Sequence, residues 1–514
     1  MRIRTSTSAL RCFASSLALC TGTALAQTTI SGPSPNPDGG NQADPLAVTA
    51  CNGAPQTGVL YRHSESEPHL AVDPTNPARM IAGWHQDRWS TGSAQSLGAA
   101  YTPDGGVSWS RVVIPFTRCA GGQPRTSGDY QRGSDPWISF GPTGTAHYMA
   151  LVSNHTGNQN AMTVARSADG GRTWSAPVVI ARSPAEDPTQ VSLFHDKNTL
   201  TADPYDASRV YATWTLFRAG ATSLVFSRST DGGRNWSPAV PIATLGTVER
   251  SEKAYFRQGA QIVVLPDGTL INAFFRNIFD NRTGTFRTEQ AILRSTDQGR
   301  HWERVDRPVA AFISGTAVDP ELGVPVRDAA GLPSIAVNRA NGLLYLAWQD
   351  RQANSLGLVG VYMARSSDGG VTWSAPVRVN QGTADVVQAF LPTVAVNDEG
   401  TVGVLYYDFR RDIPEDEELT TDVHVSLFDP ALNYAGEHLL TPQSFDLRQA
   451  VITGERGYFL GDYLGFAAAG GDFVAAIAVT NRLGLPVEYP QDNSGLRVDI
   501  NNRQDIVFVR LPLP

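Results

Sequence analysis

An eight-residue motif recurs five times along the chain, and it constrains the fold more than any other feature. Each copy has Ser or Thr at its first position, Asp at the third, Gly at the fifth and Trp at the last. Five copies of a pattern this long are hard to obtain by chance. The copies span residues 102–109, 167–174, 229–236, 295–302 and 366–373.

The motif predicts a β-hairpin. Each copy follows an alternating apolar run, such as residues 361–365, which is typical of a strand. Asp followed by Gly forms tight turns, because the carboxylate accepts backbone N–H bonds and Gly adopts a positive φ without steric cost. The Trp begins the return strand, where its ring can pack between neighbouring hairpins. We therefore expect the five motif aspartates to be structural, with a catalytic role as the less favoured alternative. They are Asp104, Asp169, Asp231, Asp297 and Asp368.

This motif resembles the Asp box, or BNR repeat, of sialidases and related β-propellers. In that family the boxes lie on outer hairpins, away from the active site. The resemblance implies an all-β propeller, and it implies that the five motif aspartates support the fold.

A larger unit of roughly 60 to 70 residues repeats around the motif, which is the scale of a propeller blade. Each unit opens with an apolar strand such as 333–337, followed by a second strand such as 344–348. The motif hairpin supplies the third and fourth strands in the first five units. Seven such units predict a β-propeller of four-stranded blades. A six-bladed ring with one inserted unit, as in sialidases, is the alternative.

The last unit lacks a fourth strand, and residues 46–49 form a short apolar segment that could supply it. Such a strand would close the ring and cover its sheet edges. We therefore expect a propeller closed by an N-terminal strand.

The N-terminus has the pattern of a secretory signal peptide. Basic Arg2 and Arg4 precede a short apolar run, and small residues at 24–26 suit cleavage. That run is too short to span a membrane. We expect export from a bacterium to the periplasm or beyond. The predicted division is a signal peptide at 1–26, a Pro/Gly-rich linker at 27–45, and one propeller domain at 46–514.

Two of the four cysteines, Cys12 and Cys20, fall within the predicted signal peptide. Cys51 and Cys119 remain, and an oxidising compartment would allow them to form a disulfide. Two separate buried thiols are an equally favoured alternative. The net charge of −8 argues against a nucleic-acid surface. We expect a monomer without a membrane span.

Candidate site residues follow from the predicted blades. The first strand of each blade lines the central channel, so polar residues just before these strands should meet at one face. A second polar set follows the second strands. Any single member could instead cap a strand or lie in solvent. The first set is Glu65, Glu67, Asp135, Asp196, Lys197, Arg257, Gln258, Arg327, Asp328, Gln388, Asp462 and Tyr463; the second is Asp87, Arg88, Trp89, Arg276, Asn277, Asp350, Arg351, Asp408 and Arg410.

The resemblance to sialidases extends to parts of these sets. Tyr61-Arg62 is similar to the family's first-arginine segment, and residues 261–277 are similar to its middle-arginine segment. Asp462-Tyr463 resembles the strand that carries the nucleophilic Tyr. The resemblance implies that Arg62 and Arg276 bind the substrate carboxylate and that Tyr463 attacks.

Two departures from the family pattern concern catalysis. Gln258 stands near the position of the Glu that activates the family's Tyr, and a neutral phenol is a weak nucleophile. Asp462, or a Glu from another blade, could substitute. Asp87, beside Arg88, could match the family's acid/base Asp.

These residues are compatible with three functions. The first is a secreted sialidase-like glycoside hydrolase acting on sialic-acid-type or other anionic glycans. The second is another glycosidase or a lyase, with carboxylates such as Glu67, Asp135 and Asp462 as acid and base, and Lys197, Arg257 or Arg327 holding a sugar acid. The third is a non-catalytic propeller that binds glycans or proteins. No cofactor is expected, although Asp135, Asp196 and Asp462 could hold a central Ca²⁺.

Overall fold

The protein is all-β in the part of the chain that the computed structural model describes. The described residues are 25–36, 60–154, 159–183, 193–218, 221–243, 253–351, 356–381, 387–454, 457–480 and 504–514. Two short 3₁₀ turns, η2 (Arg118–Ala120) and η3 (Leu447–Gln449), are the helical elements among them. None of the helices in these ranges has the length and apolar character needed to cross a membrane.

The strands follow one another in antiparallel sets of four. The first three sets are β3 (Ser66–Val72), β4 (Met80–Trp89), β5 (Ala94–Thr102) and β6 (Ser110–Val113); β7 (Arg132–Phe140), β8 (Ala146–Ser153), β9 (Asn160–Ser167) and β10 (Val178–Arg182); and β11 (Leu193–Ala202), β12 (Val210–Arg218), β13 (Ala221–Ser229) and β14 (Val240–Ala243). The first two sets join through β5 and β7 into one nine-stranded sheet that also includes β2 (Leu60–Tyr61).

Three further sets and a last sheet complete the order. The sets are β15 (Lys253–Val264), β16 (Leu270–Asp280), β17 (Thr285–Ser295) and β18 (Arg307–Phe312); β19 (Ser334–Val337), β20 (Leu344–Asp350), β21 (Gly360–Ser366) and β22 (Val377–Arg378); and β23 (Ala389–Val396), β24 (Val402–Asp408), β25 (Thr420–Phe428) and β26 (Tyr434–Leu439). Short strands β27 (Phe445–Asp446), β28 (Val451–Ile452) and β29 (Tyr458–Phe459) precede the last sheet, which holds β30 (Gly465–Ala469), β31 (Asp472–Thr480), β32 (Gln504–Leu511) and β1 (Gln27–Thr29).

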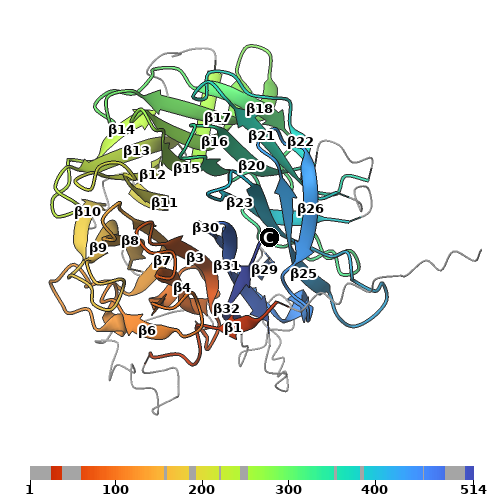
Figure 1. Ribbon diagram of the computed structural model, residues 1–514, viewed down its shortest axis with the longest axis horizontal. Helices are drawn as coiled ribbons and strands as arrows, with labels where there is room; N and C mark the ends of the chain where they lie inside the picture. The colour runs from red at the N-terminus through yellow and green to blue at the C-terminus, as the bar shows by residue number, and fades with distance from the viewer. Residues whose placement is uncertain are drawn as a thin grey trace, which may run out of the picture.

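The sheets are arranged around a common centre (Figure 1). Each set's first strand contacts the first strands of the two sets beside it, in the order β3, β7, β11, β15, β19, β23 and β30, and β30 contacts β3 again. The core lies between neighbouring sheets, where second strands bury large rings such as Trp84, Trp214 and Trp348. Apolar burial between sheets therefore holds the ring of first strands in place.

The N-terminal strand that completes the last sheet differs from the expected one. Gln27 pairs with Val509 and Thr29 with Val507, and the Ile30 N–H donates to Ile506 at 2.9 Å. The segment expected to begin a linker therefore supplies the fourth strand, and Ile30, directly after it, is buried. Residues 46–49, the expected closing strand, lie outside the described residues, as does most of the predicted signal peptide.

Five first strands share a β-bulge at the same depth. The register shifts there, and one residue at each bulge has a φ between 51° and 76°, a region that L-residues seldom adopt. These residues are Glu67, Asp135, Lys197, Gly259 and Leu391. Several candidate site residues of the first set thus lie inside the first strands, whereas the sequence placed them just before these strands. The strands begin earlier because a bulge carries the pairing past the polar residues.

The eight-residue motifs form exposed hairpin turns. In the copy at 366–373, Asp368 Oδ1 accepts the Thr372 N–H at 2.9 Å and the Ser366 hydroxyl at 2.8 Å. The Gly at the fifth position of each copy packs closely against the neighbouring sheet. At Gly299, where φ is +78°, a Cβ would lie 2.3 Å from the Phe226 ring. The motif therefore fastens one sheet to the next.

Candidate functional site

Nine polar side chains gather where the first strands of the first three sets meet the loop before β30. We call them the central cluster. They are Glu67, His85, Arg88, Asp135, Asp196, Lys197, Arg327, Asp462 and Tyr463, and all but His85 were expected at the site from the sequence. Two sheets and the segments before β19 and β30 contribute, so segments far apart in the sequence build the cluster.

Asp462 is the anionic centre of the cluster. Its Oδ2 lies 2.7 Å from Lys197 Nζ and 3.0 Å from Arg327 Nη2. Its Oδ1 is buried without a hydrogen-bond partner among the described residues. Burial alone would raise the pKa of Asp462, but Arg327 and Lys197 hold it well below its ordinary value. The side chain is therefore ionised and keeps one oxygen free.

Lys197 also reaches a second carboxylate. Its Nζ lies 3.4 Å from Asp196 Oδ1, so the ammonium group stands between two of the three aspartates expected to hold Ca²⁺. Burial raises the pKa of Asp196 to about 6, against the opposing effect of Lys197. The side chains of Asp196 and Arg327 are 21% and 20% exposed, which makes this the side of the cluster that a solute can reach.

Glu67 and His85 form a buried pair on β3 and β4. Glu67 Oε2 lies 2.7 Å from His85 Nε2, and Oε1 accepts the Asp462 N–H at 3.2 Å. Burial, with Asp462 and Asp135 nearby, raises the pKa of Glu67 to about 8. Burial and Arg88 lower the pKa of His85 well below its ordinary value. His85 is therefore neutral, and Glu67 is largely protonated at neutral pH.

The bulge carboxylates also position the backbone. Asp135 Oδ2 accepts the Lys197 N–H at 2.8 Å, and Asn198 Nδ2 donates to the Asp135 carbonyl at 3.0 Å. The bulge of β7 is thereby tied to β11, the next first strand. This explains how residues with an unfavourable φ are held, since surrounding contacts must compensate for backbone strain.

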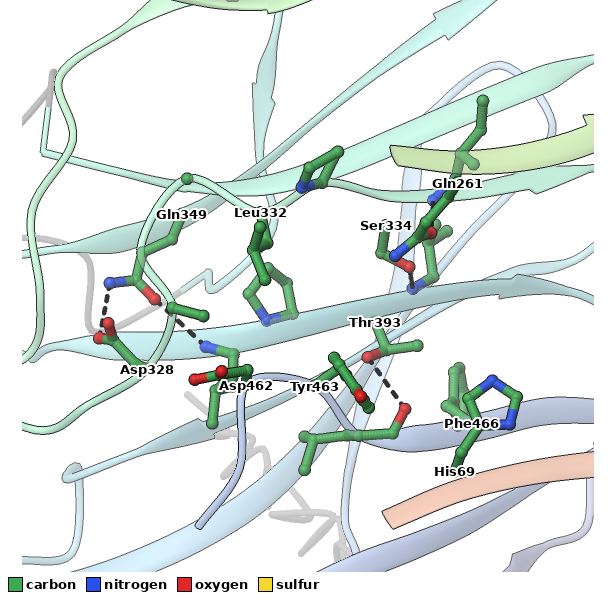
Figure 2. A pocket seen from close by; sticks show the side chains of 18 of the residues that line it. His69, Gln261, Asp328, Leu332, Ser334, Gln349, Thr393, Asp462, Tyr463 and Phe466 are labelled. Atoms are coloured by element: carbon green, nitrogen blue, oxygen red, sulfur yellow. Dashed lines mark hydrogen bonds between the residues drawn. The ribbon is translucent and has the colours of Figure 1, made fainter. Parts of the chain in front are cut away.

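Tyr463 lies at a cavity of about 130 Å³ inside the ring of first strands (Figure 2). Its hydroxyl is buried and has no hydrogen-bond partner among the described residues. Trp137 meets its ring edge-on at 5.4 Å, and His69 packs on Trp137 at 4.2 Å. Burial raises the pKa of Tyr463 well above its ordinary value, and Asp135, Glu67, Asp462 and Asp196 add to the effect. The phenol is therefore neutral.

Two other candidate site residues, Asp328 and Gln388, form hydrogen bonds with the loops around the cavity. Asp328 accepts the Ala317 N–H and Gln349 Nε2, both at 2.8 Å, and Figure 2 shows its bond to Gln349. Gln388 bonds both the N–H and the carbonyl of Val318. These contacts order the segment before β19.

Arg257 and Arg276 lie in a separate ion-pair cluster of the fourth set. Arg257 Nε lies 2.7 Å from Asp306 Oδ2, and Arg276 lies 3.2 Å from the same oxygen and 2.6 Å from Glu289 Oε2. Both guanidinium groups are buried and already paired. The sequence predicted that Arg257 and Arg276 bind substrate. In the structure they pair with Asp306 and Glu289, away from Tyr463.

Arg62 and Asp87 also lie apart from Tyr463. Arg62 is exposed. Asp87 is buried and accepts the His63 N–H at 3.0 Å, Asn36 Nδ2 at 2.7 Å and the Ser34 hydroxyl. Asp87 therefore fastens the N-terminal segment to the first set, because its oxygens are taken up by these donors.

Arg88, expected to bind substrate, is buried in the cluster. Its guanidinium lies over the Phe459 ring at 4.2 Å, and Arg327 lies over the same ring at 4.7 Å. Sequence reasoning missed His85, because a single His within a strand carries no motif and only the pairing with β3 brings it to Glu67. Cys119 is disulfide-bonded, and Cys51, its expected partner, lies outside the described residues.

Comparison with known proteins gives partial likenesses. No family model matches the chain. A sialidase of Bacteroides fragilis (strain YCH46) is 24% identical over 329 residues, which are 60% of this chain and 53% of that protein, so the chain spans about half the length of this curated relative. The solved Hadza microbial sialidase Hz136 is 13% identical, with a TM-score of 0.45 over 83% of this chain and 75% of its own. A PL25 ulvan lyase is 12% identical, with a TM-score of 0.46 over 82% and 93%.

Proposed function

We propose that the protein is an exported glycoside hydrolase that acts at the central cluster on glycans ending in an acidic sugar, with sialosides as the first substrates to test. The observation that carries this proposal is the unpartnered Tyr463 hydroxyl, buried in a cavity beside Asp462 and the cations that hold it. The partial identity to a sialidase supports the choice of substrate class.

The proposal takes the fold to be a seven-bladed propeller of one domain. Support comes from the four-stranded sets and from the closed cycle of contacts among their first strands. In such a fold the central cavity is shared by all blades, and polar groups converging on it form the default binding site.

Lys197 and Arg327 are proposed to hold the sugar carboxylate. They are the cations on the accessible side of the cluster, with side chains 10% and 20% exposed. Both contact Asp462 Oδ2, and a substrate carboxylate could share the same donors because each cation has several N–H groups. Arg88 is buried, so it is proposed to add positive charge to the site without contacting the substrate.

Tyr463 is proposed as the nucleophile. The ionised form of Glu67, whose share grows as the pH approaches its pKa of about 8, is proposed as the group that accepts the Tyr463 proton. Glu67 is close enough to raise the pKa of Tyr463, and it would replace the Glu that the sequence lacks near Gln258. A neutral phenol suits an anionic substrate, because a carboxylate nucleophile would repel the sugar acid. Asp196, the most exposed carboxylate of the cluster, is proposed as the acid/base.

The test is release of the aglycone from a fluorogenic sialoside by the mature protein and by Tyr463→Phe. We expect turnover by the wild type and a loss of at least about 100-fold in the variant. Tyr205→Phe, at a half-exposed tyrosine outside the cluster, is the matched control and should keep full activity. Full activity in Tyr463→Phe would exclude the proposed nucleophile.

A second candidate is elimination from a uronic-acid polysaccharide. Asp462 Oδ1 and the Tyr463 hydroxyl are both unpartnered next to Lys197 and Arg327, and such cations would stabilise the negative charge that develops when a proton leaves the carbon beside a carboxylate. Elimination gives an unsaturated sugar that absorbs ultraviolet light. That absorbance, without sialoside turnover, would favour this alternative.

A further inference from the structure

The strands of the fourth set extend further than those of the fifth set. β15, β16 and β17 have 12, 11 and 11 residues, whereas β20 and β21 have 7 each. The bulge of β15 at Gly259 corresponds to the bulge of β3 at Glu67, and pairing of β15 with β16 continues before it back to Lys253. The residues before Gly259 therefore lie at the end of the ring that carries the central cluster, and the β16–β17 hairpin rises there.

One face of this hairpin carries phenylalanines in successive rows. Residues directly opposite each other in antiparallel strands have their side chains on the same face, and so do residues two apart along one strand. From the tip downward the rows are Phe279 and Phe286; then Phe256, Asn277 and Thr288; then Phe275 and Gln290. We call the four phenylalanines of these rows the aromatic face.

The aromatic face begins at the wall of the central cavity. Gly331 lines the cavity at which Tyr463 lies (Figure 2). A Cβ on Gly331 would lie 3.6 Å from the Phe275 ring, and Gln290 Nε2 donates to the Gly331 carbonyl at 3.0 Å. The next ring, Phe256, has its centroid 5.9 Å from that of Phe275. The face therefore leads from the cavity wall toward the tip of the hairpin.

Exposure increases along the face with distance from the cavity. Phe275 is 8% exposed, Phe279 43% and Phe286 63%. Four residues along a strand span about 13 Å, so Phe279 lies roughly that far from Phe275. A single exposed ring is common in proteins, but Phe279 and Phe286 are directly opposite each other and form one apolar surface. This surface is open to a ligand that also enters the cavity.

The polar groups of these rows are neutral. Thr288 Oγ1 donates to Asn277 Oδ1 at 2.9 Å, and Asn277 Nδ2 has no hydrogen-bond partner among the described residues. None of the residues that pair in the three rows is charged. Sugar rings combine apolar C–H groups, which pack on the negative face of an aromatic ring, with hydroxyl groups, which accept from an amide. The rows thus match the chemistry of neutral sugars.

We propose that the aromatic face binds the neutral sugars that follow the terminal acidic sugar of the glycan. Phe279 and Phe286 stack on these sugars, and Asn277 Nδ2 donates to a hydroxyl group between them. The inference rests on the proposed function, which places the terminal sugar at the central cluster. A second copy of the chain suits the face less well, because two exposed rings offer far less than the roughly 800 Å² per partner that a stable interface buries.

The first experiment compares kcat/KM on two sialosides for the mature protein and the double variant Phe279→Ser, Phe286→Ser. A fluorogenic sialoside has no further sugar, whereas a sialylated milk oligosaccharide has several neutral ones. We expect the variant to lose about 10-fold on the oligosaccharide and less than about twofold on the fluorogenic substrate. Tyr434→Ser, at an exposed aromatic residue of the sixth set, should change neither.

Equal losses on the two substrates would contradict the inference. Absence of turnover of both substrates by the wild type would instead refute the proposed function, and a second experiment without turnover then decides the inference.

That second experiment is saturation-transfer NMR with the same milk oligosaccharide lacking its sialic acid. We expect transfer to its sugar C–H protons from the wild type and from Phe279→Tyr, Phe286→Tyr, which keeps both rings, and none from the Ser double variant. No transfer from the wild type, or equal transfer from the Ser variant, would overturn the inference. A dimer in sedimentation that the Ser variant abolishes would also overturn it, because the face would then bind a second copy.

Discussion

At the scale of single residues, the cluster depends on charges that compensate one another. Asp462 has two cationic partners within 3.0 Å, and Lys197 bridges it to Asp196. Removing one member of a buried ion pair leaves the others uncompensated, which costs more than the pair contributes when intact. The cluster is therefore expected to be sensitive to substitution in both stability and activity.

Lys197→Met tests this compensation. We expect the free energy of unfolding to fall by about 3 to 5 kcal/mol, because Asp462 loses its closest cation. Chemical denaturation measures the change. Arg209→Met breaks a more exposed pair with Asp206 and should cost no more than about 1 kcal/mol. Equal effects of the two substitutions would show that the buried pair carries no special weight.

The raised pKa of Glu67 predicts a pH dependence of stability. Because this pKa is about 8 in the folded protein and about 4.5 for an unperturbed Glu, the folded state holds more protons between these values. Glu67 therefore makes the free energy of unfolding fall as pH rises from about 5 to about 8, by at most about 1.4 kcal/mol per pH unit. In Glu67→Gln this part of the slope should vanish. An unchanged slope in the variant would contradict the burial argument.

At the scale of elements, the repeated motif is where sequence and structure agree most closely. Asp and Gly at fixed spacing predicted the turns, since turn chemistry is local. The repeat also predicted which candidate site residues lie near the first strands. It did not predict where those strands begin, because a bulge depends on pairing with the next strand. His85 was missed for the same reason: its partner Glu67 is 18 positions away in sequence but directly across the sheet.

The glycine at the fifth motif position is predicted to be required by close packing as well as by its φ. Gly299→Ala would place a Cβ 2.3 Å from Phe226, whereas Gly268→Ala, at a similar φ, meets nothing within 4 Å. We expect about 1 kcal/mol of destabilisation for Gly268→Ala and about 1 to 3 kcal/mol more for Gly299→Ala. Thermal unfolding compares them. Equal losses would mean that the backbone conformation alone fixes this glycine.

At the scale of the whole molecule, the N-terminal strand joins the two ends of the chain. β1 pairs along β32, and the following segment bonds Asp87 through Ser34 and Asn36. The sequence predicted a closing strand but placed it later, because residues 27–29 are polar and carry little strand signal. The pairing is decided by the free edge of β32, which lies far away in the sequence.

Deleting residues 27–31 tests this closure. We expect a lower unfolding temperature and more aggregation, because the edge of β32 would be uncovered and Ile30 lost from the core. Light scattering during thermal unfolding measures both effects. Replacing Thr28 and Thr29 by Ser keeps the backbone pairing and is the control. A deletion variant as stable as the wild type would show that the strand adds nothing to the ring.

The central claim is that Tyr463 attacks the anomeric carbon of an acidic sugar. The most direct measurement is mass spectrometry of the protein after reaction with a fluorinated sialosyl fluoride, which slows breakdown of a covalent intermediate. The account predicts one sugar adduct on the peptide that contains Tyr463, absent in Tyr463→Phe and present in Tyr205→Phe. Sialoside turnover without an adduct on that peptide, or an adduct on another residue, would contradict it.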